Sequence, residues 1–119
     1  MLGLSFKPGT DDVRDSPALK LIANFNNYGC SFHLNDPCAM KNFKNYYPPT
    51  NKIKYFNSAY DTVKDCDLVI IATDWDDYKK LDFSIVKKYM KCNIIADARN
   101  CLDKKLLTDL GFIYIGLGQ

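Results

Sequence analysis

A chain of 119 residues is long enough to form one domain, 1–119, with a core of its own, because a chain of that size buries roughly two thirds of its unfolded surface. Its composition, 47% hydrophobic and 25% charged, is typical of a globular protein, and no apolar run approaches the roughly 20 residues that cross a bilayer. The cations behind the net charge of +2 are spread along the chain and give no electrostatic footprint for nucleic acid. We therefore expect no nucleic acid or membrane partner and no signal peptide.

The cysteines indicate a reducing compartment. They are five in number, and no two of them form the C-x-x-C pair that binds zinc or carries redox chemistry: Cys30, Cys38, Cys66, Cys92 and Cys101. Unpaired cysteine behaves as a small hydrophobe where thiols stay reduced. We therefore expect free thiols, a cytoplasmic protein and no metal site.

The opening segment LGLSFKPGTDDVRDSP, residues 2–17, combines an apolar run, a bend and a helix start. The apolar or small residues at 2–6 suit a buried parallel strand, although so short a run would also fit a core helix. Pro8 and Gly9 end that run. Ser16 before Pro17 predicts a helix N-cap followed by proline at the first helical position, where its missing N–H costs nothing.

Strands and helices alternate along the rest of the chain. From Pro17 the apolar residues recur with helical spacing, and Gly29 stands where a left-handed helix stop belongs. Further strands are predicted at 30–35, 53–56, 67–73, 93–96 and 112–115, and further helices at 39–44, 59–64, around 83–90, and from Asp103 to Gly111. This order predicts an α/β fold, a doubly wound, Rossmann-like parallel sheet of about five or six strands with helices on both faces. The apolar run 67–73 should be its middle strand, covered on both faces.

Open parallel sheets bind ligands beyond the carboxyl ends of their strands, where the strand order reverses. Three loops there are polar, and they carry Lys7, Thr10, Asp11, Asp12 and Arg14, then Thr73, Asp74 and Trp75, and finally Asp97, Arg99 and Asn100. Lys7 and Arg99 are the candidate ligands of a phosphate or diphosphate, since lysine offers a point charge and arginine a two-pronged donor. The alternative for both is a solvated charge or a structural ion pair.

Other residues near these loops have two interpretations each. Asp11 and Asp12 either accept bonds from ligand hydroxyls or pair with the cations of their own loop. Phe6 belongs either to the core or beside a ligand base, and Trp75 either lines a pocket or packs structurally.

Several familiar motifs are missing. No G-x-G-x-x-G follows the first strand, so this domain should not hold NAD in the usual phosphate loop, although Asp36 imitates the acidic ribose ligand of that motif. The only histidine, His33, lies within an alternating strand, and there is no nucleophile elbow or P-loop. The sequence contains no complete catalytic set.

Four motifs together resemble one family. FKPGTDDVRDSP, the central strand running into T-D-W, D-A-R-N and the closing GFIYIGLG are similar to the C-terminal, UDP-binding domain of the UDP-glucose/GDP-mannose dehydrogenase family. The likeness covers nearly the whole chain, and its first motif is long and specific. It implies an enzyme that oxidises the C6 alcohol of UDP-glucose to a carboxylate in two NAD-dependent hydride transfers, through a thioester on a cysteine.

The resemblance also implies residue roles. Phe6, Lys7 and Arg99 match positions that contact the UDP-sugar, and Arg14 matches a position that reaches NAD held by another domain. The departures are small: Asp15 where Glu is common, Ala98 where Gly is common, and Asp74 in a T-E-W-like motif. Only Ala98 bears on the site, because a Cβ there limits close backbone approach to a ligand.

The family's N-terminal NAD-binding domain, its central dimer-forming helix and its catalytic cysteine motif have no counterpart in this sequence. We therefore assign no nucleophile and expect a piece of a longer enzyme that is inactive alone and dimeric only at full length. A UDP-N-acetylhexosamine or GDP-mannose dehydrogenase domain, or a stand-alone nucleotide-binding module, remain alternatives.

Overall fold

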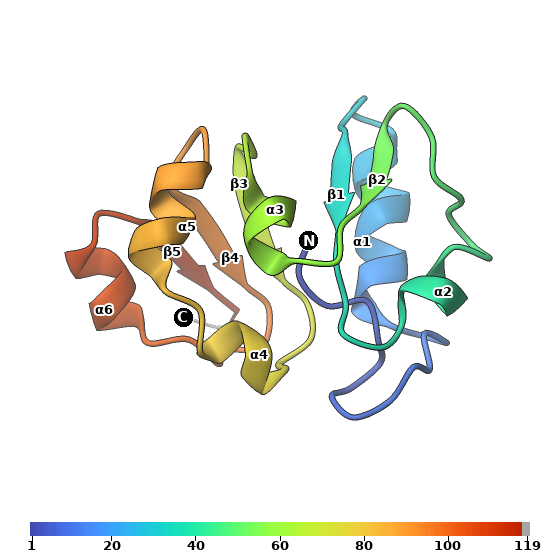
Figure 1. The fold of residues 1–119 in the computed structure, drawn as a ribbon, viewed down its shortest axis with the longest axis horizontal. Helices are drawn as coiled ribbons and strands as arrows, with labels where there is room; N and C mark the ends of the chain where they lie inside the picture. The colour runs from blue at the N-terminus through green and yellow to red at the C-terminus, as the bar shows by residue number, and fades with distance from the viewer. Residues whose placement is uncertain (118–119) are drawn as a thin grey trace.

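The computed structural model describes residues 1–117, which form six helices and five strands (Figure 1). The helices are α1 (Pro17–Asn26), α2 (Met40–Phe43), α3 (Ala59–Val63), α4 (Asp76–Lys79), α5 (Phe83–Tyr89) and α6 (Lys104–Asp109). The strands are β1 (Phe32–Leu34), β2 (Ile53–Tyr55), β3 (Leu68–Ile71), β4 (Ile94–Asp97) and β5 (Ile113–Gly116). Gly118 of the closing motif lies outside the described residues.

The strands form two parallel sheets joined through one residue. One sheet pairs β1 with β2, and the other has the order β3-β4-β5. Leu2 lies between them and makes parallel bridges to Asn35 and to Ile71. The combined order is therefore β2-β1-Leu2-β3-β4-β5. The strand order reverses at Leu2, because the chain first winds outward through β1 and β2 and then returns to β3.

The predicted first strand, residues 2–6, is wrong in extent, because only Leu2 pairs on both sides. Gly3 follows with φ of +101°, a conformation that ends an extended strand. A Cβ on Gly3 would lie 2.4 Å from the backbone nitrogen of Thr73. The chain therefore leaves the sheet at a close backbone contact that only glycine allows. The strand count is lower than predicted, because the structure has a two-stranded and a three-stranded sheet in place of one sheet of about five or six strands.

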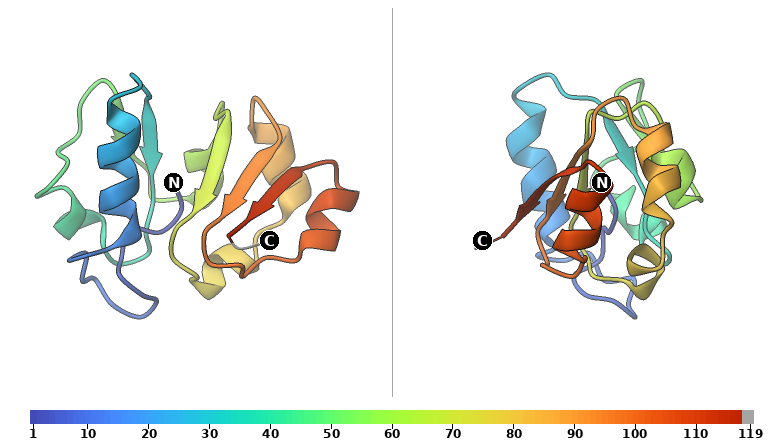
Figure 2. Two further views of the ribbon diagram at one scale, coloured as in Figure 1. Left: turned by 180° about the vertical axis from the view of Figure 1, so that it is seen from behind. Right: turned by 90° about the vertical axis from the view of Figure 1, so that its left-hand side faces the viewer.

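The doubly wound α/β class is confirmed. Helix α1 lies on one side of the strands, and α3 and α5 lie on the other (Figure 2). The side chains of Ser16, Ser58 and Asp103 cap α1, α3 and α6 by accepting bonds from backbone N–H groups in the first turns.

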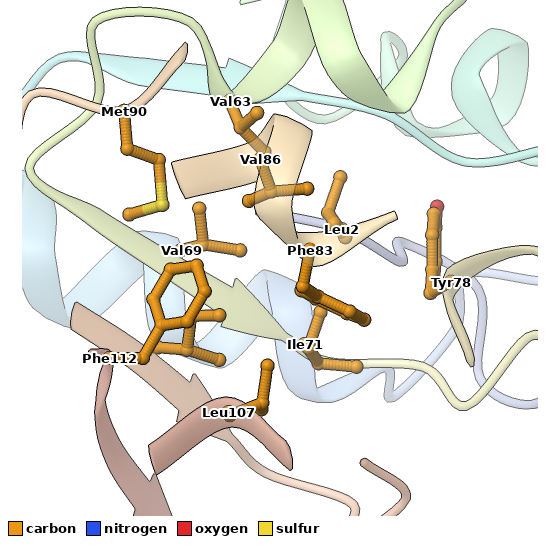
Figure 3. Close-up of a cluster of buried hydrophobic side chains, with 11 residues drawn as sticks. Leu2, Val63, Val69, Ile71, Tyr78, Phe83, Val86, Met90, Leu107 and Phe112 are labelled. Atoms are coloured by element: carbon orange, nitrogen blue, oxygen red, sulfur yellow. The ribbon is translucent and has the colours of Figure 1, made fainter. Parts of the chain in front are cut away.

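Two apolar clusters hold these layers together. One joins β3, β4 and the adjoining helices and includes Leu2, Val69, Ile71, Ile95 and Leu107 (Figure 3). The other packs α1 and α2 against β1 and β2, with Ile22, Leu34 and Phe43 fully buried. Since Leu2 is buried in the first cluster and bridges to Asn35 beside the second, it ties the two halves together.

The expectation that β3 is covered on both faces fails only at its first residue, because on the second face Ile70 is partly buried against the cluster that contains α1. Val69 and Ile71 are buried, whereas Leu68 is 37% exposed. Figure 2 shows the reason: α1 lies over the β1 side of the sheet and does not reach across β4 and β5. Ile113 and Ile115 of the edge strand β5 are accordingly exposed.

The longest helix within residues 1–117 is α1, with 10 residues. None of the helices in this range is long and apolar enough to span a bilayer.

Replacement of Gly3 tests the close contact that ends the first strand. We expect Gly3→Ala to lower the free energy of unfolding by about 2 kcal/mol or more, because the added methyl meets the Thr73 backbone in a strained conformation. Urea unfolding measures the change. Gly9→Ala is the control, since φ is +81° there but nothing lies within 4 Å, and it should cost about 1 kcal/mol. Equal losses in both variants would contradict the close approach.

Candidate functional site

Three loops that are distant in sequence meet beside Leu2, at the carboxyl ends of the strands. We call this surface the polar rim and define it as residues 5–16, 72–75 and 98–102. The Thr73 hydroxyl donates to the carbonyl oxygen of Ser5 at 2.7 Å and so joins the first two loops. The third loop follows β4, next to β3 in the sheet. The rim therefore lies where the strand order reverses, the place at which open parallel sheets bind ligands.

Arg99 connects all three loops of the polar rim. Its Nε donates to the carbonyl of Ala72 at 2.9 Å, and its Nη2 donates to the carbonyl of Phe6 at 2.9 Å. These bonds use two of the five N–H donors of the guanidinium and fix its plane, which leaves three donors for a ligand. Because Phe6 precedes Lys7, the structure brings the predicted arginine to the segment that carries the predicted lysine.

Phe6 and Lys7 are both exposed at the rim. Phe6 is 48% exposed, so the interpretation of Phe6 as a core residue is wrong. Its backbone is nevertheless fixed, because the Phe6 N–H donates to the carbonyl of Asp12 at 2.7 Å. An exposed ring and an exposed amine on a fixed backbone can both meet a ligand without rearrangement. Contact of either group with a diphosphate or base stays a prediction.

Asp36 organises the first loop from inside the protein. Its carboxylate is 1% exposed, and Oδ2 accepts bonds from the backbone N–H of Leu4 at 2.8 Å and of Ser5 at 3.0 Å. Oδ1 accepts from the N–H of Cys38 and of Ala39, at 2.8 and 2.9 Å. Asp36 stands where the dinucleotide-binding motif has its acidic ribose ligand, but its carboxylate faces the protein interior and therefore does not serve as such a ligand. Sequence reasoning missed this role, although an acidic residue directly after a buried strand and before a proline was a usable signal.

Trp75 is held by the same carboxylate. Its indole Nε1 lies 3.2 Å from Oδ2 of Asp36 and 3.1 Å from the hydroxyl oxygen of Ser5. The ring is half-buried and also lines a hollow of about 430 Å³ with Pro8 and Gly9. Both interpretations of Trp75 therefore apply, structural packing at the indole nitrogen and pocket lining at the ring.

Asp97 plays the matching role in the third loop. It is 1% exposed, and its carboxylate accepts from the N–H of Arg99 at 3.1 Å, of Leu102 at 2.8 Å and from the hydroxyl of Tyr114 at 2.8 Å. Burial and this carboxylate raise the pKa of Tyr114 to about 12. Asp97 thus fixes the backbone at Arg99 and is a positioning residue. The sequence analysis placed Asp97 in the loop after the strand and gave it no role, whereas the structure makes it the last residue of β4.

Arg14 pairs with Asp12 within the first loop. Nε and Nη2 of Arg14 donate to the two carboxylate oxygens of Asp12 at 3.0 and 2.8 Å, while the Arg14 side chain remains 80% exposed. The hydrogen bonds from Arg14 lower the pKa of Asp12 to about 2. Of the two interpretations of Asp12, the one in which it pairs with a cation of its own loop is confirmed. Arg14 lines a surface hollow of about 470 Å³ with Asn42 and Tyr46.

His33 lies at the other end of the sheet from the polar rim. It belongs to β1, and its Nδ1 is 2.9 Å from the carbonyl of Thr62 and 3.5 Å from the sulfur of Cys66. Within residues 1–117, no group of three His, Cys, Asp or Glu side chains is arranged to hold a metal ion.

The open parallel sheet, its reversal at Leu2 and the polar rim beside that reversal define a Rossmann-like domain. Residues 1–104 match the model of the UDP-glucose/GDP-mannose dehydrogenase family, UDP binding domain. The chain belongs to this family, of which it matches the UDP binding domain.

Similar proteins agree on the fold and differ in substrate. A UDP-glucose 6-dehydrogenase of Rickettsia prowazekii is 36% identical over 119 residues, which are 100% of this chain and 27% of that protein. A UDP-D-ManNAc dehydrogenase structure from Pyrococcus horikoshii has a TM-score of 0.77 and 31% identity, over 98% of this chain and 24% of that one. A UDP-glucose dehydrogenase structure from Pyrobaculum islandicum has a TM-score of 0.77 and 29% identity, with the same coverage of 98% and 24%. This chain therefore spans about a quarter of the length of its relatives.

The buried carboxylate is tested by Asp36→Asn, which keeps the shape and removes acceptors. We expect the free energy of unfolding to fall by about 3 kcal/mol, because an amide nitrogen then faces buried N–H groups. Chemical denaturation measures the loss. Asp77→Asn, on the exposed surface of α4, is the matched control and should change stability by about 0.5 kcal/mol or less. A loss at Asp36 no larger than the control would show that the carboxylate does not hold the loop.

The Arg14–Asp12 pair predicts a pH effect. The pKa of Asp12 is about 2 in the folded chain and 3.8 without its partner. The pair therefore stabilises the fold above pH 3.8, and this contribution disappears as the pH falls through 2. Arg14→Gln should return the pKa of Asp12 toward 3.8 in an NMR titration of the carboxyl carbon. The control is Lys20→Gln, at an exposed position of α1, which should leave the pKa of Asp12 unchanged. An unchanged pKa in Arg14→Gln would refute the pairing.

Proposed function

We propose that this chain is the nucleotide-sugar-binding domain of an NAD-dependent UDP-glucose 6-dehydrogenase, which converts UDP-glucose to UDP-glucuronate in two hydride transfers. The observation that carries the proposal is the pair of bonds from Arg99 to the Ala72 and Phe6 carbonyls, because they place a pre-oriented guanidinium beside the loop of Lys7. The identity of 36% to a UDP-glucose 6-dehydrogenase over the full chain supports the substrate.

In this proposal the polar rim binds the UDP part of the substrate. Lys7 places its ammonium on the diphosphate, and Arg99 uses its remaining donors on the same group, so two cations oppose the ligand's negative charge. The exposed ring of Phe6 packs beside the base or sugar. Because Asp97 fixes the backbone at Arg99 and Asp36 fixes it at Ser5, two residues before Lys7, the binding of the ligand costs little conformational entropy.

Arg14 is the residue proposed to reach NAD. NAD, held mainly by another domain, accepts the hydride. Arg14 suits contact with an external phosphate because its side chain is 80% exposed and two of its five donors are used by Asp12. The first loop lacks G-x-G-x-x-G, so this chain is not expected to hold the dinucleotide on its own.

The cysteine chemistry of the full enzyme is assigned to residues outside this chain. Cys101, which lies within the polar rim, is 3.7 Å from the Asp97 carboxylate, and burial together with that charge raises its thiol pKa to about 11. Burial also raises the pKa of Cys66. Both thiols stay protonated at neutral pH, which is unsuitable for a nucleophile. We therefore propose that the isolated domain is inactive.

The proposed partners are a nucleotide sugar, an N-terminal NAD-binding domain of the same enzyme and, at full length, a second subunit in a cytoplasmic homodimer. A UDP-N-acetylhexosamine substrate is the second candidate, because a UDP-D-ManNAc dehydrogenase structure matches 98% of the chain at 31% identity. The two candidates share the UDP contacts and differ only in the sugar.

Calorimetry tests the site. UDP and UDP-glucose should bind, and GDP should bind more weakly. Lys7→Ala and Arg99→Ala should each weaken UDP binding by on the order of 1.5–3 kcal/mol, roughly 10- to 150-fold in Kd, since each removes a charge-assisted hydrogen bond.

The matched control is Lys91→Ala, an exposed lysine before β4, at the opposite end of the sheet from the rim. It removes the same charge and should leave the Kd for UDP unchanged. A thermal melt of each variant separates loss of contact from loss of fold, which matters at Arg99 because it also bonds to two carbonyls. Unchanged affinity in folded Lys7→Ala and Arg99→Ala would refute the site.

A further inference from the structure

The outer edge of β5 is open to a further strand. β5 ends the order β3-β4-β5, so within residues 1–117 one of its sides pairs with β4 and no strand pairs with the other. The Ile113 N–H donates to the carbonyl of Asn93, on the β4 side. By the alternation of a parallel ladder, Tyr114 and Gly116 direct their N–H and carbonyl groups outward. The edge therefore offers donors and acceptors in the pattern that a neighbouring strand would use.

Exposed apolar side chains accompany this edge. Ile113, Ile115 and Leu117 are 62%, 54% and 67% exposed, and they share one face because side chains alternate along a strand. This is the face that α1 leaves uncovered over β4 and β5 (Figure 2). Residues 110–117, LGFIYIGL, contain no lysine, arginine, aspartate or glutamate. An uncharged edge with exposed β-branched side chains is the kind to which other strands add.

The opposite edge of the strands, at β2, is protected. The Ile53 backbone faces outward there, but its carbonyl accepts from the Thr50 N–H at 2.9 Å and its N–H donates to the Thr50 hydroxyl oxygen at 3.1 Å. Lys52 and Lys54 flank Ile53 and are exposed, and charged side chains keep other strands from adding to an edge. Within residues 1–117, neither kind of protection occurs at the outer edge of β5.

The position of β5 is fixed from the β4 side. The Tyr114 hydroxyl donates to the Asp97 carboxylate at 2.8 Å, and the Asn100 side-chain amide donates to the carbonyl of Leu117 at 2.6 Å. The strand is therefore already extended and held before anything pairs with it. Pairing at its outer edge costs little further ordering of the backbone.

We propose that the outer edge of β5 pairs with the same edge of a second copy of this chain, antiparallel and about a two-fold axis at Ile115. The symmetry defines the register, because a two-fold contact brings the same surface of both copies together. Tyr114 lies opposite Gly116 of the second copy, and each donates its N–H to the carbonyl of the other. The two sheets then continue into one another.

The side chains of two copies match in this register. Ile115 lies opposite Ile115 of the second copy, and Ile113 lies opposite Leu117, so the exposed apolar side chains cover one another. No like charges meet, since residues 110–117 carry none. The β2 edge of a second copy does not fit, because the outward groups of Ile53 are already bonded and lysines flank them. A second β5 is therefore the edge within the described residues that complements β5.

The contact is small and should be weak. Three side chains and the backbone of a short strand cover less than the about 800 Å² per partner of a stable complex, so we expect a Kd between about 10 µM and 1 mM. The contact differs from the dimer expected at full length, because it needs no residue outside this chain. It also does not depend on UDP binding at the polar rim.

Amide hydrogen exchange by NMR, compared at two concentrations of the chain, tests the pairing. Raising the concentration from about 0.05 to about 1 mM should slow exchange at Tyr114 and Gly116 about two- to fourfold, because the paired fraction rises. The Tyr55 amide is the internal control. It faces outward from the protected β2 edge by the same alternation, and its exchange rate should not depend on concentration.

A charge at the two-fold axis tests the register. Ile115→Lys should abolish the concentration dependence, because two ammonium groups would then face each other across the contact. Leu68→Lys is the matched control, since Leu68 is exposed on the same face but belongs to β3, two strands from the edge. It should leave the association unchanged. A thermal melt of each variant establishes that it is folded.

Three results would overturn the proposal. The first is a chain that sediments as a monomer at about 1 mM, the upper limit of the expected Kd. The second is a dimer in which the Tyr114 amide exchanges no more slowly than in the monomer, because the contact would then lie on another surface. The third is an equal loss of association in folded Ile115→Lys and Leu68→Lys, which would indicate packing of the sheet faces instead of pairing of the edges.

Discussion

The insertion of Leu2 between β1 and β3 is the contact on which the rest of the structure depends. Leu2 belongs to both ladders and is 1% exposed within the larger core cluster. Since the chain turns out of the sheet directly after it, Gly3 and Ser5 lie against Thr73 in the loop that follows β3. One packed residue thus determines where the first loop emerges and which loop it meets.

Near Leu2, two carboxylates are buried, whereas the cations of the neighbouring loops remain accessible. The carboxylates of Asp36 and Asp97 are buried and bound to backbone N–H groups, so they hold the loops in place from within. The cations remain accessible, with Lys7 exposed and Arg99 held by carbonyls through only part of its guanidinium. The hydrogen bonds to these buried carboxylates offset part of the cost of removing their charge from water. Two accessible cations on neighbouring loops at a sheet reversal are suited to a diphosphate.

The sequence was a good guide to the elements and a weaker guide to their contacts. Periodicity and capping residues predicted every strand and most helices, because Ser16 and Asp103 act through local hydrogen bonds. The first strand was overestimated, since its end depends on a contact between Gly3 and Thr73 that only the fold creates. The two rim cations were predicted from strand-end position, whereas the role of Asp36 needed a knowledge of which N–H groups it would meet.

The family match and the hydrogen bonds of the structure both point to the polar rim. Residues 1–104 match the UDP binding domain of the family, and the bonds of Arg99 and Thr73 show why the matching segments meet in space. In the proposed function, loops that the sheet brings together recognise the nucleotide, and the first loop carries no glycine-rich G-x-G-x-x-G motif.

The crystal structure of this chain with UDP tests the central claim most directly. The account predicts the diphosphate at the polar rim, with its oxygens within hydrogen-bonding distance of both the Lys7 ammonium and the Arg99 guanidinium, and with the Arg99 bonds to Phe6 and Ala72 retained. A diphosphate bound elsewhere, or held at the rim by only one of these two cations, would contradict it.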